Sequence, residues 1–430
     1  MTETLIGFAA FLALAFLRVP LALSMGIVGF FGFTYLVSMR AALSMVGQAA
    51  YETALSYTLS VVPLFILMGN FIVRAKLAEE IYRAAYAFIG HWRGGLAMST
   101  IVASGGFGSI CGSALATTAT FCQIAEPSMR RFGYKPDLIA GTIAVGGTLG
   151  ILIPPSLVFV FYGIMTEESI GQLFIAGVVP GLVAVALLCA AVAVVVRRDP
   201  EAGPPGPRED WRARLDSLRR IWAVALLFVL VLGGIYLGVF TATEGAGIGA
   251  GGAFLFAVLM GGLRLGALTD VLVQSAKTTA SLFFILIGAL VFANFVNFTS
   301  MPRDLAATIE AAALPAPVVL LLICAVYIAL GMAMEELSMI ALTVPLFYPI
   351  VVGLGYSGLW FGVVVVIVCQ IGLTTPPIGI NIFITKTMIP DLTLREAFRG
   401  TWPFNVALMV LLVLLILVPE LATFLPETAR

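Results

Sequence analysis

Two proline pairs in the middle of apolar stretches decide how this chain folds. Residues 146–156 read GGTLGILIPPS, and residues 371–381 read IGLTTPPIGIN. Two adjacent prolines remove two backbone donors and force the preceding residue out of the helical region. The sequence therefore predicts two broken helices, one interrupted at Pro154-Pro155 and the other at Pro376-Pro377.

The chain around these breaks has the composition of a membrane protein. Of its 430 residues, 61% are hydrophobic and 11% are charged, whereas soluble domains carry about 25% charged residues. Apolar runs of roughly the 20 residues that a spanning helix needs recur along the whole length. We expect an all-α polytopic fold in membrane lipid, with crossings near 4–17, 20–38, 58–73, 136–165, 171–196, 220–240, 245–262, 276–298, 358–388 and 403–424.

The charge, histidine and cysteine content argue against several kinds of function. The net charge is zero, so nothing predicts nucleic acid as a partner. The single histidine, His91, stands at a segment end, and the five cysteines lie in apolar stretches without the spacing of a metal site. We therefore expect neither an enzyme nor a protein with a bound cofactor.

The two breaks belong to an internal repeat. Aligning the two proline pairs with each other also aligns Gly150 with Gly372. The same shift aligns Gly133, which has basic neighbours, with Gly355, which has none nearby. Because basic residues favour the cytoplasmic side of a membrane, the two copies are predicted to lie in opposite orientations. This pattern is an inverted repeat.

Two further apolar regions, 94–129 and 314–352, are too long for one helix and carry glycines near their middle. Each predicts a re-entrant helical hairpin, which is tolerated at membrane depth only inside protein or beside water. The repeat then divides the chain into scaffold spans 1–57, a first repeat 58–196, a linker 197–219, scaffold spans 220–275 and a second repeat 276–430. The linker is rich in proline and glycine, and we expect it to be solvated.

The distribution of basic residues predicts the orientation. With the N-terminus outside, 20 of the 23 basic residues fall on the cytoplasmic side, and only Arg40, Arg303 and Arg430 fall outside. This asymmetry satisfies the positive-inside rule, so both termini are predicted to be periplasmic.

The breaks and the hairpin tips predict a binding site. Carbonyls freed at a half-helix C-terminus suit a cation, and amides at an N-terminus suit an anionic group; alternatively, the helices are only kinked and neighbours satisfy these groups. Small residues at the tips would also serve close packing. The candidate residues for substrate and ion binding are Ser104, Gly105, Gly106, Ser109, Gly112, Ser113, Gly147, Thr148, Gly150, Pro154, Pro155, Ser156, Gly331, Glu335, Glu336, Ser338, Gly372, Thr374, Thr375, Pro376, Pro377 and Asn381.

Several polar residues allow two interpretations. Glu335 or Glu336 at membrane depth would cost about 2.5–3.5 kcal/mol unless a helix N-terminus or a cation compensates; alternatively, both lie at a wet hairpin end. Residues 241–244 read TATE and predict a helix-capping box. The amides of Asn70, Asn294 and Asn297 suit interhelical hydrogen bonds or ion coordination equally.

These motifs together resemble the large membrane subunit of tripartite ATP-independent periplasmic (TRAP) transporters. The resemblance covers PLFILMGN at 63–70, SGGFGSICGS at 104–113, GGTLGILIPPS at 146–156, GVFTATEGA at 238–246, GMAMEELSMIALTVPLFYPI at 331–350 and IGLTTPPIGIN at 371–381. One departure is Ala242, where the family often has proline.

The resemblance implies a function and partners. It implies a bacterial inner-membrane protein in which a mobile domain of hairpins and broken helices slides against a scaffold, an elevator mechanism. It also implies sodium as the coupling ion, held by backbone carbonyls near Gly105, Ser109, Gly331 and Thr374. A periplasmic binding protein would deliver a carboxylate such as a dicarboxylate or sugar acid, and a small four-helix membrane subunit would complete the scaffold.

Two other functions compete with this one. A stand-alone sodium- or proton-coupled organic-anion symporter of the same architecture would show Ser-Asn-Thr at the hairpin tips, and 109–113 and 335–338 lack it. An intramembrane hydrolase would need a nucleophile with a histidine or an aspartate pair inside the spans, and the sequence offers neither.

Overall fold

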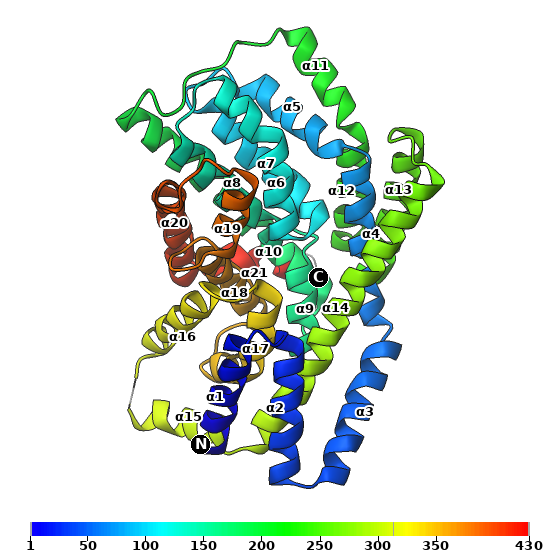
Figure 1. Cartoon of the computed structure of the whole chain (residues 1–430), viewed down its shortest axis with the longest axis vertical. Helices are drawn as coiled ribbons and strands as arrows, with labels where there is room; N and C mark the ends of the chain where they lie inside the picture. The colour runs from blue at the N-terminus through cyan, green and yellow to red at the C-terminus, as the bar shows by residue number, and fades with distance from the viewer. Residues whose placement is uncertain (1, 313, 429–430) are drawn as a thin grey trace.

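A computed structural model describes residues 2–312 and 314–428, where all regular secondary structure is helical (Figure 1). The first half contains α1 (Thr2–Phe16), α2 (Leu21–Leu36), α3 (Met39–Leu55), the short 3-10 helix η1 (Thr58–Ser60), α4 (Val61–Arg74), α5 (Leu77–Ile89), α6 (Gly95–Cys111), α7 (Ala114–Arg131), α8 (Pro136–Leu152), α9 (Leu157–Thr166) and α10 (Ile170–Arg198). The second half contains α11 (Trp211–Arg220), α12 (Trp222–Tyr236), α13 (Ala242–Leu259), α14 (Leu265–Phe298), α15 (Met301–Ala311), α16 (Ala316–Gly331), α17 (Glu336–Gly353), α18 (Gly358–Leu373), α19 (Ile380–Met388), α20 (Leu394–Leu417) and α21 (Glu420–Thr428).

The lengths and apolarity of these helices fit a membrane. Five described helices, α10, α13, α14, α17 and α20, are long and apolar enough to cross a bilayer. Three bent pairs reach the same length together, among them α8 with α9, which meet at 43° across the first proline pair. The predicted all-α polytopic fold is confirmed.

The inverted repeat extends over nearly the whole chain. Helices α1, α2 and α5–α10 of the first half correspond in order to α12, α13 and α15–α20 of the second, at a nearly constant offset along the chain. In addition, α3 and α4, which meet at 61°, correspond to the single helix α14. Figure 1 shows the hairpin α6–α7 in the upper half of the molecule and the hairpin α16–α17 in the lower half. Both predicted hairpins and both broken helices are therefore present.

The two halves are interlocked rather than side by side. Helix α2 packs along α14 of the second half, and α13 packs along α4 of the first half. A methyl group at Gly29 would lie 2.7 Å from the backbone of Val291, and one at Gly288 would lie 2.3 Å from the Ala22 carbonyl. Such close backbone approach is how membrane helices associate when lipid competes for apolar contacts.

Four helices were not predicted from the sequence, and the bounds of two others differ from those expected. The four are α3, α5, α11 and α15; the last three carry several charged residues, so they do not appear as apolar runs. Helix α14 begins at Leu265, so the expected boundary between 275 and 276 falls inside it. The crossing expected near 403–424 is present but begins and ends earlier, because α20 occupies Leu394–Leu417 and α21 follows separately.

The linker is less solvated than its composition indicates. The Gly94 and Gly206 amides donate to the carbonyls of Gly203 and Gly90, both at 2.9 Å. Arg214 in α11 is 6% exposed and donates through Nε to the Ala87 carbonyl at 3.0 Å. Most residues of 197–219 are nevertheless exposed, as expected for a solvated connection. The exceptions arise because glycines on both sides let part of the linker backbone dock on the end of α5.

Candidate functional site

Each hairpin packs backbone against backbone on the break of its own repeat. A methyl group at Gly150, near the end of α8, would lie 2.9 Å from the Cα of Gly108 in α6. A methyl group at Gly372, near the end of α18, would lie 2.7 Å from the Cα of Gly331 in α16. These glycines therefore bring both hairpin turns against the breaks.

The turns themselves also contact the breaks. The first turn has Gly112 at φ +66°, where a Cβ would lie 3.2 Å from the Leu157 side chain at the start of α9. In the second repeat Gly379, at φ +61°, donates its amide to the Met332 carbonyl at 3.1 Å. Positive φ angles of this kind favour glycine, so both junctions depend on residues without a side chain.

The second helix of each hairpin runs alongside the resumed helix of the other repeat. Helix α7 packs on α19, and α17 packs on α9. Cys122 of α7 lies beside Thr385 of α19, whereas the rings of Tyr348 in α17 and Tyr162 in α9 are 6.2 Å apart. All four helices begin at the hairpin turns or the breaks, so four helix N-termini face the centre of the protein.

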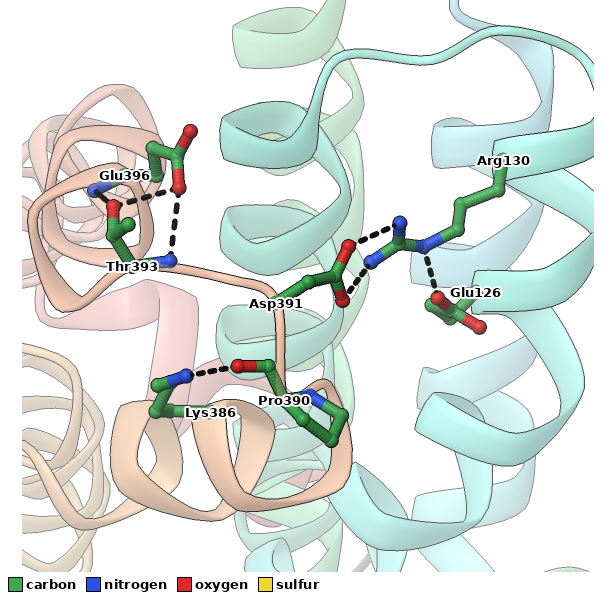
Figure 2. Close-up of polar contacts among 7 residues, drawn as sticks. All are labelled: Glu126, Arg130, Lys386, Pro390, Asp391, Thr393 and Glu396. Atoms are coloured by element: carbon green, nitrogen blue, oxygen red, sulfur yellow. Dashed lines mark hydrogen bonds and ion pairs between the residues drawn. The ribbon is translucent and has the colours of Figure 1, made fainter.

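The outer ends of these helix pairs are joined by polar contacts. In Figure 2 the Arg130 guanidinium, at the end of α7, donates two hydrogen bonds to the Asp391 carboxylate, at 2.6 and 2.7 Å. Arg130 also pairs with Glu126. At the other pair, the Tyr348 hydroxyl donates to Glu168 Oε1 at 2.8 Å. We call the Arg130–Asp391 and Tyr348–Glu168 contacts the outer ties.

The four central N-termini differ in their capping. Ser113 Oγ accepts from the Ala116 amide at 3.4 Å and caps α7, and Glu335 caps α17. Among the described residues, no side chain caps α9 or α19. Ser156, at the N-cap position of α9, donates its hydroxyl to the Ile151 carbonyl at 2.6 Å instead. Uncapped amides at a helix N-terminus form a site for an anionic group.

Many carbonyls near the breaks already have partners. Ser109 Oγ donates to the Gly106 carbonyl at 2.9 Å. Asn405 of α20 donates to the Thr374 carbonyl at 2.9 Å, and the Thr374 hydroxyl donates to Asn405 Oδ1 at 2.6 Å. The Thr375 hydroxyl donates to the Ile371 carbonyl. Neighbouring side chains thus donate hydrogen bonds to some of the backbone carbonyls near the breaks, as the interpretation of merely kinked helices requires.

Two buried amides cross from the second repeat to α8 of the first. Gln370 Nε2 donates to the Thr148 carbonyl at 2.8 Å, and Asn381 Nδ2 donates to the Ala144 carbonyl at 3.1 Å. Because a carbonyl only accepts, these contacts fix which end of each amide faces α8. Within residues 2–312 and 314–428, Gln370 Oε1 and Asn381 Oδ1 have no hydrogen-bond donor. Both side chains are fully buried, so each orphaned oxygen calls for a water or a cation.

The remaining predicted residues line α6 and α8. The hydroxyl of Ser104 is buried, has no partner among the described side chains and backbone, and lies toward Gly146. A methyl group at Gly147 would lie 1.9 Å from Thr118 Oγ1. Gly105 lies inside α6 and faces Ile153. In an α-helix its carbonyl accepts the amide of the residue four positions on, and its role as a sodium ligand stays a prediction.

The two acidic residues of the second hairpin have different surroundings. Glu335 Oε1 accepts from the Ser338 amide at 3.2 Å and from its hydroxyl at 2.8 Å. Glu336 is 4% exposed, and its Oε2 has no partner in the described part of the chain. A wet hairpin end therefore does not describe Glu336, which is enclosed by protein at the first position of α17.

The structure also decides two of the open alternatives. Thr241 and Glu244 form the predicted capping box at the start of α13, with bonds of 2.8 and 3.2 Å. Asn70 Nδ2 donates to Ser275 Oγ at 2.8 Å, which is an interhelical hydrogen bond between α4 and α14.

Sequence reasoning overlooked Gln370 and Asn405. Each is a single amide within an otherwise apolar span, as in VVVVIVCQIG at 363–372. Polar residues at membrane depth are candidates for function on that ground alone. Both amides could have been chosen on this ground, but the candidate residues were selected mainly for their place at proline pairs and glycine-rich turns.

Comparisons with known proteins agree with the geometry. The family model described as "Tripartite ATP-independent periplasmic transporter, DctM component" matches residues 8–421. The chain is 36% identical to the C4-dicarboxylate TRAP transporter large permease protein DctM of Pseudomonas aeruginosa, over 88% of each chain. It is 32% identical to the sialic acid TRAP transporter large permease protein SiaM of Vibrio cholerae, over 86% of this chain and 87% of that one.

A solved structure shares the fold. The YdaH transporter of Alcanivorax borkumensis superposes with a TM-score of 0.64 over 89% of this chain and 90% of that one, at 14% identity. Large permeases of the TRAP family work with a small membrane subunit and a periplasmic binding protein. The chain belongs to the DctM component family of tripartite ATP-independent periplasmic transporters, and it is a multi-pass membrane transport subunit rather than an enzyme.

Proposed function

We propose that this chain conducts sodium-coupled uptake of a small carboxylate, which a periplasmic binding protein delivers. The two similar permeases described above are named for C4-dicarboxylates and for sialic acid, and both kinds of compound contain carboxylates. The observation that carries the proposal is the meeting of both hairpin turns with both helix breaks at Gly108–Gly150 and Gly331–Gly372. Helix N-termini, which carry partial positive charge, and helix C-termini, which carry partial negative charge, therefore lie in one region of the protein.

The uncapped N-termini of α9 and α19 are the proposed binding points for the substrate carboxylate. The amides of their first turns lack intrahelical partners, and the helix dipole adds positive potential there. By contrast, Glu335 already accepts from the Ser338 amide at the start of α17. An anionic group would therefore favour α9 and α19 over α17.

Neutral oxygens are the proposed sodium ligands. Gln370 Oε1 and Asn381 Oδ1 can accept but not donate, so a cation suits them. Hard monovalent and divalent cations both prefer oxygen ligands, but a set without a carboxylate offers little to a divalent ion. Carbonyls near Ser109 and Gly331 complete the proposed set; Thr374 already accepts from Asn405, so a cation there would share its carbonyl.

The inverted repeat supports an elevator mechanism. Two copies of one unit in opposite orientations offer two nearly equivalent states, one facing each side of the membrane. In this proposal the hairpins and broken helices move against α1–α4 and α12–α14. A cavity of about 750 Å³ lies between α5 and α7 on the basic, cytoplasmic side, with Lys76, Glu79 and Arg83 in its wall.

A small four-helix membrane subunit and a binding protein complete the proposed system in a bacterial inner membrane. Both termini are proposed to be periplasmic, because that orientation places most basic residues in the cytoplasm. Arg430, one of the three basic residues predicted outside, lies outside the described residues.

Reconstitution tests the proposal. The purified chain and its small subunit would be placed in vesicles, and uptake of a labelled C4-dicarboxylate and of sialic acid would be measured with and without the binding protein. We expect uptake only with the binding protein and an inward sodium gradient. Uptake that persists in sodium-free buffer under a proton gradient would contradict sodium coupling, and uptake without the binding protein would favour a stand-alone symporter.

A further inference from the structure

The outer ties lie in similar places in the two repeats, about one helical turn apart on the hairpin helix. The alignment of the two proline pairs places Tyr348 opposite Glu126, the partner of Arg130 on α7. Asp391 and Glu168 also correspond, because they follow the starts of α19 and α9 at the same distance along the chain. Each repeat thus joins the outer end of one hairpin to the connection that follows the broken helix of the other repeat.

The chemistry of the two ties differs although both join the same pair of elements in the repeat. The first tie is ionic and bidentate, and Figure 2 shows Glu126 on the other side of Arg130. The second tie is a phenol bound to a carboxylate, and it is partly buried. The Glu168 carboxylate also fills the space above Gly358, where a methyl group would lie 1.9 Å from its Oε1. Different residues therefore produce one arrangement twice.

The geometry gives the ties a mechanical consequence. Helices α7 and α19 run side by side with their N-termini toward the candidate site, and so do α9 and α17. A helix is stiff along its axis, with a rise of about 1.5 Å per residue. Fixing one helix against the other at the outer end therefore fixes their relative axial position at the inner end.

We propose that Arg130–Asp391 and Tyr348–Glu168 are positioning pairs that set the axial register of the two helix pairs and so the spacing of the N-termini at the candidate site. All four side chains lie at the outer ends of these helix pairs, away from the turns and breaks. The link to sodium and substrate rests on the proposed function, whereas the link to register rests on geometry alone.

The exposure of the first tie separates positioning from folding. Arg130 and Asp391 have side chains that are 38% and 65% exposed. Exposed ion pairs contribute little to folding stability. Variants of this tie should therefore fold, insert and purify like the parent, which leaves register as the property that changes.

The first measurement needs no transport. Cys111 lies in the last turn of α6, next to the first hairpin turn, and is half-buried. With Cys122, Cys189, Cys324 and Cys369 replaced by alanine, the rate of maleimide modification of Cys111 would be measured in the purified chain. Arg130→Ala and Asp391→Ala should each change this rate about threefold or more, since an exposed pair is worth up to about a factor of five.

Two further variants test whether the contact itself matters. The double exchange of Arg130→Asp with Asp391→Arg rebuilds the ion pair in reverse and should return the Cys111 rate toward that of the parent. Arg131→Ala is the matched control, because Arg131 is the next residue, is also exposed, and should leave the rate unchanged. Unchanged rates in both single variants, or no recovery in the double exchange, would overturn the proposal.

The second tie supplies an independent test. Tyr348→Phe removes only the hydroxyl that Glu168 accepts, and Tyr356→Phe is its control, because that ring stacks on Trp360 at 4.9 Å. In the reconstituted system we expect Tyr348→Phe and Arg130→Ala to raise the half-saturating sodium concentration, and both controls to leave it unchanged. Equal sodium dependence in all four would contradict the proposal. Uptake without any sodium dependence in the parent, together with the expected Cys111 rates, would refute sodium coupling and leave the positioning role standing.

Discussion

Gly372→Ala should separate the second hairpin from its break. The added methyl carbon would lie 2.7 Å from the Cα of Gly331, 2.9 Å from its carbonyl carbon and 3.2 Å from the Ile328 carbonyl oxygen. Carbon atoms pack at about 3.5–4.0 Å, so the two backbones must part by roughly 1 Å. All three neighbours are backbone atoms, and no rotamer change can relieve the contact.

The expected size of the effect follows from this displacement. Overpacking of this kind costs about 1–3 kcal/mol. A domain of 150–250 residues loses about 2–4 °C of unfolding midpoint per kcal/mol, so this cost corresponds to roughly 2–12 °C, and a value in the lower part of that range is expected in this longer chain. Uptake should fall by more than stability alone implies, ~10-fold or more, because a shift of about 1 Å misaligns groups that bind together.

The assay compares Gly372→Ala with Gly251→Ala. Gly251 lies inside α13, and a methyl group there meets no atom within 4 Å. Alanine at such a helical position should keep or slightly raise the stability. Unfolding midpoint and initial uptake rate would be measured on both purified variants. If Gly372→Ala matched Gly251→Ala in both, the inferred contact between hairpin and break would be refuted.

Three other perturbations have clear expected outcomes. Replacing Pro154-Pro155 or Pro376-Pro377 by Ala-Ala should let the helix re-form and abolish uptake, while the protein still reaches the membrane. Surface labelling and uptake assays would measure the two properties. Near-normal uptake in both variants would mean that the breaks are only structural. Thr241→Ala should lower stability by about 1 kcal/mol with normal uptake, because the capping box lies away from the hairpin turns; a loss of uptake at unchanged stability would contradict this. The Arg130 guanidinium lowers the pKa of the Asp391 carboxyl, so the ion pair should persist above the ordinary value of about 3.9 and be lost only as the pH falls below it. The Cys111 modification rate, corrected for thiol ionisation, should therefore not change between pH 8 and pH 6 because of this pair. A change in the parent that is absent in Asp391→Ala would contradict this.

The elements that sequence could predict are those with unusual backbone. Proline pairs and glycine-rich turns leave a direct mark, so both broken helices and both hairpins were predicted from the residues themselves. Helices α5 and α15 leave no such mark, because their charges hide them from a search for apolar runs. The extent of the repeat was underestimated for the same reason, since its equivalence is visible in helix positions rather than in identical residues.

Contacts between segments that are distant along the chain could not be predicted from the sequence. The bond from Gln370 to Thr148 joins positions that the repeat makes equivalent, whereas Arg130 and Asp391 are not equivalent positions. An alignment of the two copies predicts neither the Gln370–Thr148 contact nor the Arg130–Asp391 contact, because the way the two repeats interlock determines which segments lie side by side. The predicted site residues are brought to the hairpin turns and breaks, whereas their roles as ligands stay predictions.

Sodium binding by the purified chain is the decisive test of a sodium site between the hairpins and the broken helices. The unfolding midpoint would be measured in sodium and in potassium at equal ionic strength, for the parent, Asn381→Leu and Asn297→Leu; Asn297 is an exposed amide in α14 and serves as the control. A ligand at ten times its Kd stabilises the folded state by about 1.4 kcal/mol. The account predicts a higher midpoint in sodium for the parent and for Asn297→Leu, and a loss of that difference in Asn381→Leu. An equal sodium effect in all three proteins, or none in the parent, would contradict a sodium site at the junction of hairpins and broken helices.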